Sequence, residues 1–457
     1  MIRNDRYFLS LYFSLLLIVP CLLCTSCKKN NAPTSITDEK NVSKPVTMTV
    51  EIDLGTMTDA NSGWRQLLDS IEAADKYVNL DLSACTMNGT EFNPDCTVET
   101  GKNKIVNITL PITAESIANG PRVEGNGIGT FEHFTVLESF NGEGLTSIGS
   151  FAFVGCKSLT QITLPERLTN IGWGAFKGCT GLTQIILPEG LRVISSYAFI
   201  ECSGLTQIKL PKGLRLIDRG VFKDCTSLTQ IVLPEGLFYI MDYAFEGCTS
   251  LTQIVLPEGL LSIGEYIFNN CTDLTQVTLP ADLRSTYAFS PFNGCSSLES
   301  FIVIGSGPLS AAIGGKALVE NNTKLVAYPS ARGSITLPEE ISSIGENAFI
   351  RCTDLTQITL PSEITSIGYR AFYGTGLTQI TLPEKLRSID GSAFESCKNL
   401  SLVICLAEYP PYLEKDVFKD TRGTFAIHVP ADSVDMYKED WNGDWSGYGN
   451  RIHAIEM

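Results

Sequence analysis

A repeat of 23 residues organises most of this chain, and it constrains the fold more than any other feature of the sequence. Proline, cysteine and phenylalanine all recur with this spacing. The prolines are Pro165, Pro188, Pro211, Pro234, Pro257 and Pro280, and the series resumes at Pro338, Pro361 and Pro383. The cysteines are Cys156, Cys179, Cys202, Cys225, Cys248 and Cys271, and the phenylalanines are Phe153, Phe176, Phe199, Phe222, Phe245 and Phe268. Units this short cannot each bury a core, so they must stack on one another.

The unit that begins at Leu159 shows how one coil is built. Residues 159–164 read Leu-Thr-Gln-Ile-Thr-Leu, which is the alternation of a β-strand, and Pro165 ends the strand because proline cannot donate a ladder hydrogen bond. Apolar residues then recur up to the next cysteine, and up to 14 such units start between residues 77 and 405. We therefore predict a mainly β repeat solenoid of 23-residue coils, with one strand per coil in a parallel sheet.

The flanks and one internal break do not follow the repeat. Between Pro280 and Pro338 the spacing is two periods plus 12 residues, which predicts an inserted loop or hairpin near 305–333 that could bend the stack. Trp64, Leu67 and Ile71 have helical spacing, so we expect a helix over roughly 61–75 within an N-terminal cap at 46–76. Residues 406–457 are expected to form a C-terminal cap, because an open solenoid end exposes apolar surface and strand edges.

The first 27 residues have the pattern of an export signal. Arg3 and Arg6 precede an apolar run over 7–23, and Ser26-Cys27 resembles the cleavage and lipidation site of a bacterial lipoprotein signal. A plain signal peptide or a signal anchor is the alternative. With lipidation at Cys27, the mature chain would be exported and anchored to the bacterial outer membrane by acyl chains. The polar residues 28–45 would then form a flexible tether.

Charge and composition argue against several functions. The net charge is −16, from 34 basic and 50 acidic side chains, and an acidic chain repels nucleic acid. The chain has only three histidines, and no catalytic triad, phosphate loop or metal-ligand spacing surrounds them. We therefore expect no catalysis, no metal, no cofactor and no small-molecule substrate. An enzyme site in the 299–333 region or in the N-terminal region is the remaining alternative.

The periodic cysteines are expected to be structural. Cysteines at one position of consecutive coils form a line, whereas a metal site needs ligands that converge on one point. Side chains on parallel coils also stay farther apart than a disulfide favours. A small buried side chain with a weak S–H donor fits better, and Thr375 takes the same position in one unit. Cys85 and Cys96 lie outside this series, and a disulfide between them is plausible in an oxidising compartment.

The outward positions of the strands are the candidate binding face. They comprise Gln161, Thr163, Gln184, Ile186, Gln207, Lys209, Gln230, Val232, Gln253, Val255, Gln276 and Thr278. Aliphatic residues on an exposed strand can mark a partner surface, or they can reflect strand propensity alone. Glutamates that follow the prolines, such as Glu166 and Glu189, are expected to line a solvated turn.

The repeated unit resembles the BspA-like leucine-rich repeat family of bacterial surface proteins. It combines Leu-Thr-Gln-Ile-Thr-Leu-Pro with a following Leu, Ile-Gly, Ala-Phe and Cys, and the resemblance covers residues 77–457. It implies a leucine-rich repeat solenoid over 77–405, no catalytic residues, and a surface scaffold that binds host matrix proteins, other cells or glycans. The alternative is a structural protein that organises envelope partners of the same cell.

Overall fold

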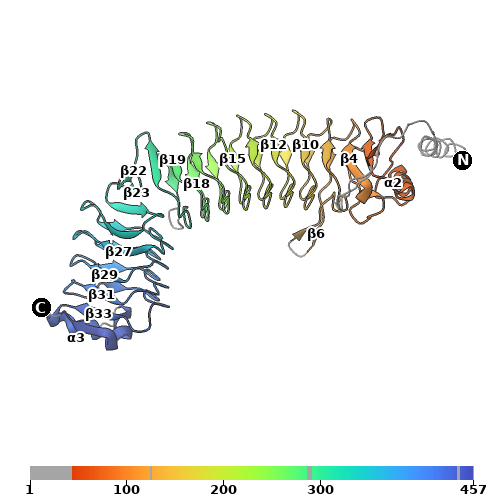
Figure 1. Ribbon diagram of the computed structural model, residues 1–457. Helices are drawn as coiled ribbons and strands as arrows, with labels where there is room; N and C mark the ends of the chain where they lie inside the picture. The colour runs from red at the N-terminus through yellow and green to blue at the C-terminus, as the bar shows by residue number, and fades with distance from the viewer. Residues whose placement is uncertain (1–43, 124–125, 286–290, 440–442, 456–457) are drawn as a thin grey trace, which may run out of the picture.

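The computed structural model describes residues 44–123, 126–285, 291–439 and 443–455. These residues form a long stack of coils that bends once, so that two arms meet at an angle near strands β22 and β23 (Figure 1). The predicted signal peptide 1–27, including Cys27, lies outside the described residues, as does the predicted tether up to residue 43. No helix in the described part of the chain is both long enough and apolar enough to span a membrane.

The main strands follow one another along both arms and, in the described residues, pair in parallel within five separate sheets. They are β1 (Val46–Thr49), β2 (Val78–Asp81), β4 (Ile105–Thr109), β8 (Ser139–Asn141), β10 (Gln161–Thr163), β12 (Gln184–Ile186), β14 (Gln207–Lys209), β17 (Gln253–Val255), β19 (Gln276–Pro280), β21 (Ser300–Ile304), β25 (Gly333–Thr336), β27 (Leu355–Thr359), β29 (Gln379–Leu382), β31 (Leu402–Cys405), β33 (Ala426–Val429) and β34 (Ile452–Ala454). Gln184 pairs with Gln207, and Gln253 with Gln276. The predicted 23-residue solenoid with one main strand per coil is therefore confirmed, although the coil at Leu228 has no assigned strand there.

A second, shorter ladder follows the proline turn. Its two-residue strands are β3 (Glu91–Phe92), β5 (Ser116–Ile117), β9 (Ser147–Ile148), β11 (Asn170–Ile171), β13 (Val193–Ile194), β15 (Leu216–Ile217), β16 (Tyr239–Ile240), β18 (Ser262–Ile263), β20 (Arg284–Ser285), β26 (Ser343–Ile344), β28 (Ser366–Ile367), β30 (Ser388–Ile389) and β32 (Tyr412–Leu413). Two residues are too few for alternation to appear in the sequence, so this ladder was not predicted. A separate antiparallel hairpin, β6 (Arg122–Val123) with β7 (Asn126–Gly127), projects from the first arm (Figure 1).

Antiparallel strands occupy the predicted insert. Strand β22 (Leu309–Ala312) pairs with β23 (Ala317–Glu320), which pairs with β24 (Lys324–Ala327), and β24 then joins the short ladder through β26. Successive side chains of a strand point to opposite faces. Accordingly, Leu318 packs into the core of the first arm, whereas Ala317 and Val319 pack into the core of the second arm. The insert thus separates two apolar cores at the bend.

Stacked phenylalanine rings run through both cores. The centroids of Phe153 and Phe176 are 5.2 Å apart, and their planes differ by 2°. The series continues to Phe292 in the first arm, and it runs from Phe349 to Phe418 in the second. Coil spacing in a parallel sheet is about 4.8 Å, so each ring contacts the equivalent ring of the next coil.

Helices and buried aromatic side chains lie at the two ends. Helix α2 (Gly63–Ala74) corresponds to the helix expected over 61–75, and it buries Trp64, Leu67, Leu68 and Ile71. The C-terminal end contains η3 (Ala431–Ser433), α3 (Val434–Lys438) and η4 (Asp444–Arg451). There the indole of Trp445 donates to the Pro411 carbonyl at 2.6 Å. A short η2 (Lys102–Lys104) lies near α2.

Candidate functional site

The predicted binding-face residues lie on the outward side of the main strands. We call this surface the strand face. The exposed members are Gln161, Thr163, Gln184, Ile186, Gln207, Lys209, Gln230, Val232, Gln253 and Val255, whereas Gln276 and Thr278 are half-buried. Equivalent residues are in register within the paired strands, and the repeat places Gln230 and Val232 of the intervening coil in the same columns of the first arm.

One column of the strand face carries exposed aliphatic side chains in several coils of the first arm, and Thr163, Lys209 and Thr278 occupy the same position in the other coils. We call its aliphatic members the aliphatic column. Ile186 is 67% exposed, Val232 81% and Val255 57%. Ile302, which pairs with Thr278, extends this column, and it was not predicted because its unit departs from the repeat. The equivalent residues of the second arm are Thr336, Thr359 and Thr381, all exposed, followed by the half-buried Ile404 and His428. Since the same coil accepts threonine at this position, the fold does not require an aliphatic side chain there.

The neighbouring threonine column is part of the framework. Its hydroxyl groups donate to backbone carbonyls of the preceding coil, at 3.0 Å from Thr206 to Thr183 and at 3.0 Å from Thr275 to Thr252. The same contact recurs in the second arm, where Thr356 donates to Gly333 at 3.1 Å. These side chains tie adjacent coils together, which leaves the glutamine and aliphatic columns as the outward surface of the strands.

The cysteine column is buried and hydrogen-bonded. The thiol of Cys202 donates to the Phe176 carbonyl at 3.0 Å, and that of Cys225 donates to Phe199 at 3.2 Å. The same contact is made by Cys156, Cys179, Cys248, Cys271, Cys295 and Cys397. Burial raises the pKa of the Cys202 thiol to about 12, so the group stays protonated and can donate at neutral pH.

The other cysteines among the described residues are also thiols. Cys85 and Cys96, between which a disulfide was expected to be plausible, are both free. The buried Cys85 thiol donates to the Val50 carbonyl at 3.3 Å. This contact resembles those of the periodic cysteines, which explains why a buried cysteine here needs no covalent partner.

The structure brings few titratable side chains together. Among the described residues, no three His, Cys, Asp or Glu side chains form a group that could hold a metal ion. His428 and His453, far apart in the sequence, lie on the paired strands β33 and β34 with ring centroids 5.9 Å apart. Their proximity was not predicted, because β34 departs from the repeat pattern.

A comparison with known families settles the relationship. The BspA type leucine rich repeat region matches in six copies, over residues 127–237, 216–332 and 328–438. The chain belongs to this family. Leucine-rich repeat proteins present extended surfaces to other molecules, and members of this kind are repeat scaffolds that bind proteins. No curated protein matches the chain.

Solved structures of similar proteins exist. A leucine-rich repeat protein from Bacteroides ovatus is 25% identical, with 78% of this chain and 85% of that chain covered, and the TM-score is 0.49. A leucine rich cell surface protein from Faecalibacterium prausnitzii is 24% identical, with 70% and 83% covered, and the TM-score is 0.50. The second likeness is one of fold.

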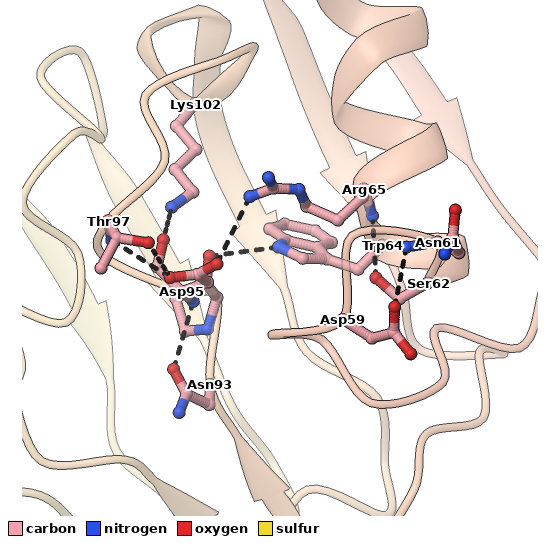
Figure 2. Close-up of polar contacts among 10 residues, drawn as sticks. Asp59, Asn61, Ser62, Trp64, Arg65, Asn93, Asp95, Thr97 and Lys102 are labelled. Atoms are coloured by element: carbon pink, nitrogen blue, oxygen red, sulfur yellow. Dashed lines mark hydrogen bonds and ion pairs between the residues drawn. The ribbon is translucent and has the colours of Figure 1, made fainter.

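The N-terminal end of this BspA-type protein holds a buried lysine. Figure 2 shows Lys102 reaching the backbone carbonyl of Asp95, whose carboxylate accepts from Arg65 at 3.3 Å. The indole of Trp64 donates to the Pro94 carbonyl at 3.2 Å. Burial lowers the pKa of Lys102 to about 8. Because Lys102 is fully buried, this network fixes the loop against α2 rather than offering a reactive amine.

Proposed function

We propose that this protein is displayed on the bacterial cell surface and binds host matrix proteins, other cells or glycans through the strand face of its first arm. The observation that carries the proposal is the exposed aliphatic column at Ile186, Val232 and Val255. Full burial of one such side chain by a partner would contribute about 1.5–3 kcal/mol to the free energy of binding. Three consecutive coils of the second arm have exposed threonine at this position, which supports binding rather than strand propensity as the role of the exposed aliphatic side chains.

Surface display is supported by the family and by the N-terminal sequence. BspA-type proteins are surface proteins, and Ser26-Cys27 follows an apolar run with a basic start. We infer that Cys27 carries the lipid and that residues 28–45 tether the solenoid to the outer membrane. A rigid solenoid loses little freedom on binding, so a modest contact area can give useful affinity.

A solid-phase screen of matrix proteins, whole cells and glycans tests this function. The wild-type protein is compared with V232E/V255E, which places charges in the aliphatic column, and with T359E/T381E, the matched change in the second arm. We expect V232E/V255E to weaken binding of any captured ligand by about tenfold or more, because a buried unpaired charge is costly.

The controls separate the surface from the fold and from the location. T359E/T381E should bind like wild type, and both variants should keep the wild-type thermal midpoint because every changed side chain is exposed. Protease treatment of intact cells should abolish ligand binding by those cells. If no ligand is captured, or if V232E/V255E binds normally, the strand face is not the binding surface. Capture of envelope proteins of the same cell alone would favour an assembly role.

A further inference from the structure

One coil of this acidic protein carries cations on successive outward positions. Lys209, Lys212, Arg215 and Arg219 all belong to the coil at 205–227, and all four are exposed. Arg192 occupies the same position as Arg215 in the preceding coil and is also exposed. In a chain with 34 basic and 50 acidic side chains, this is a concentrated positive band.

The cations of this band make no close salt bridges among the described residues, although Arg219 interacts electrostatically with Glu265. In the part of the chain that the structure describes, no carboxylate forms an ion pair with any of these five cations. The nearby carboxylates of Glu189 and Asp218 accept from the backbone N–H groups of Lys212 and Arg219 instead. The guanidinium of Arg215 donates to the Gly236 carbonyl at 2.7 Å.

Apolar side chains adjoin the band on the side of the short ladder. Phe238, Tyr239, Met241 and Leu261 are between 39% and 50% exposed. The Arg215 guanidinium lies 5.1 Å from the centroid of the Phe238 ring, a cation–π contact.

These groups lie on one surface because backbone hydrogen bonds connect their adjacent coils. The N–H of Arg215 donates to the Arg192 carbonyl, that of Phe238 to Arg215, and that of Leu261 to Phe238. We define the cation–aromatic patch as Arg192, Lys212, Arg215, Phe238, Tyr239 and Leu261.

The same positions in other coils show that the fold does not require these residues. Where the patch has Phe238 and Tyr239, an earlier coil has Thr169 and Asn170. The second arm has Ser342 with Ser343, Thr365 with Ser366, Arg387 with Ser388, and Pro411 with Tyr412, so no coil of it has Phe238 and Tyr239 together. The patch is therefore confined to a few consecutive coils, which are the same coils that carry the aliphatic column of the strand face.

We propose that the cation–aromatic patch docks an acidic segment of a partner protein that also carries apolar side chains. The inference rests on the proposed binding function and names a second contact surface and the chemistry of the partner. Arginine, tyrosine, phenylalanine and methionine are enriched in protein interfaces. Unpaired cations complement carboxylates, which accelerates association and excludes basic partners. The mixture of phenylalanine and leucine with the cations favours a protein over an anionic glycan.

Selection from a random phage-displayed peptide library tests the proposal on the purified protein. We expect the enriched peptides to combine Asp or Glu with apolar residues. Their affinity should fall about tenfold or more in R215E and in F238T/Y239S, which install the side chains of Thr365 and Ser366. The matched control is R387E, since Arg387 is an exposed arginine at the position of Arg215 in the second arm, and it should bind like wild type.

Several results would overturn the proposal. Enriched peptides that are neutral or basic would do so, as would equal affinity for wild type, R215E and F238T/Y239S. If the wild-type protein and F238T/Y239S bind a sulfated polysaccharide and R215E does not, the ligand of the patch is a glycan. Concentration-dependent dimers that R215E abolishes would assign it to a second copy. If V232E/V255E keeps all ligand binding while R215E loses peptide binding, the strand-face proposal is wrong and the patch proposal is supported. If V232E/V255E loses ligand binding while R215E keeps peptide binding, only the patch proposal is wrong.

Discussion

The two arms of the solenoid share one repeat but differ in what they expose. Both have stacked phenylalanines, the same parallel ladders and the same threonine contacts between coils. Yet the strand face of the first arm carries Ile186 and Val232, where the second arm carries Thr359 and Thr381. The inward residues are thus sufficient to build the coil. The outward residues are free to vary, and their difference is the reason we propose the first arm as the binding arm.

The arms also differ in their cysteine columns. In the first arm, seven consecutive cysteines from Cys156 to Cys295 donate to carbonyls of the preceding coil. In the second arm, Thr375 separates Cys352 from Cys397, and its hydroxyl lies 3.2 Å from the Cys397 thiol. Both groups are small and can donate a hydrogen bond, so either one satisfies the buried site.

Alkaline pH should have the largest effect and should separate the arms. The ordinary thiol pKa is 9.0, and burial raises the pKa of Cys202 and Cys271 to about 12. Between these values the unfolded chain releases thiol protons that the folded protein retains, so the free energy of unfolding falls as pH rises. The loss reaches up to about 4 kcal/mol per thiol at pH 12. We expect the first arm to become protease-sensitive at a lower pH than the second, as followed by mass spectrometry of the fragments.

A variant of the cysteine column provides the control for this pH effect. We would change Cys202, Cys225 and Cys248 to threonine, the residue that takes this position at Thr375. The first arm should then become protease-sensitive only at a higher pH. Lys102 has the opposite effect, because folding lowers its pKa from 10.5 to about 8. Between these values its contribution to the free energy of unfolding increases as pH rises. If both arms of the wild-type protein become protease-sensitive at the same pH, thiol burial does not determine the pH at which the protein unfolds.

The separation of the two cores can be tested with one matched pair of cavities. Phe222→Ala and Phe372→Ala each remove a stacked ring, and each should cost about 3–5 kcal/mol. Because repeat stability is a sum of local terms, each variant should raise hydrogen exchange mainly in its own arm. Exchange measured by mass spectrometry distinguishes the peptides of the arms. Equal loss of protection throughout the chain in both variants would mean that the insert couples the cores rather than dividing them.

The sequence was most informative where residues repeat. Proline, phenylalanine and cysteine at one spacing predicted the solenoid, and the outward glutamine column predicted the strand face. The short ladder was missed because two-residue strands leave no alternation to read. The cation–aromatic patch lies beside that ladder, in which Tyr239 takes part, so Phe238 and Tyr239 could not be assigned to a surface. Lys102 was missed because its burial depends on Asp95 and α2, which the repeat does not specify.

We propose that the aliphatic column of the first arm binds the partner, whereas the fold does not depend on it. The most direct measurement is ligand affinity of I186T/V232T/V255T, which gives the first arm the threonines of the second. We predict a loss of about tenfold or more in affinity for a ligand captured in the solid-phase screen, with an unchanged thermal midpoint. Wild-type affinity in this variant would contradict the claim and leave the column as an ordinary strand surface.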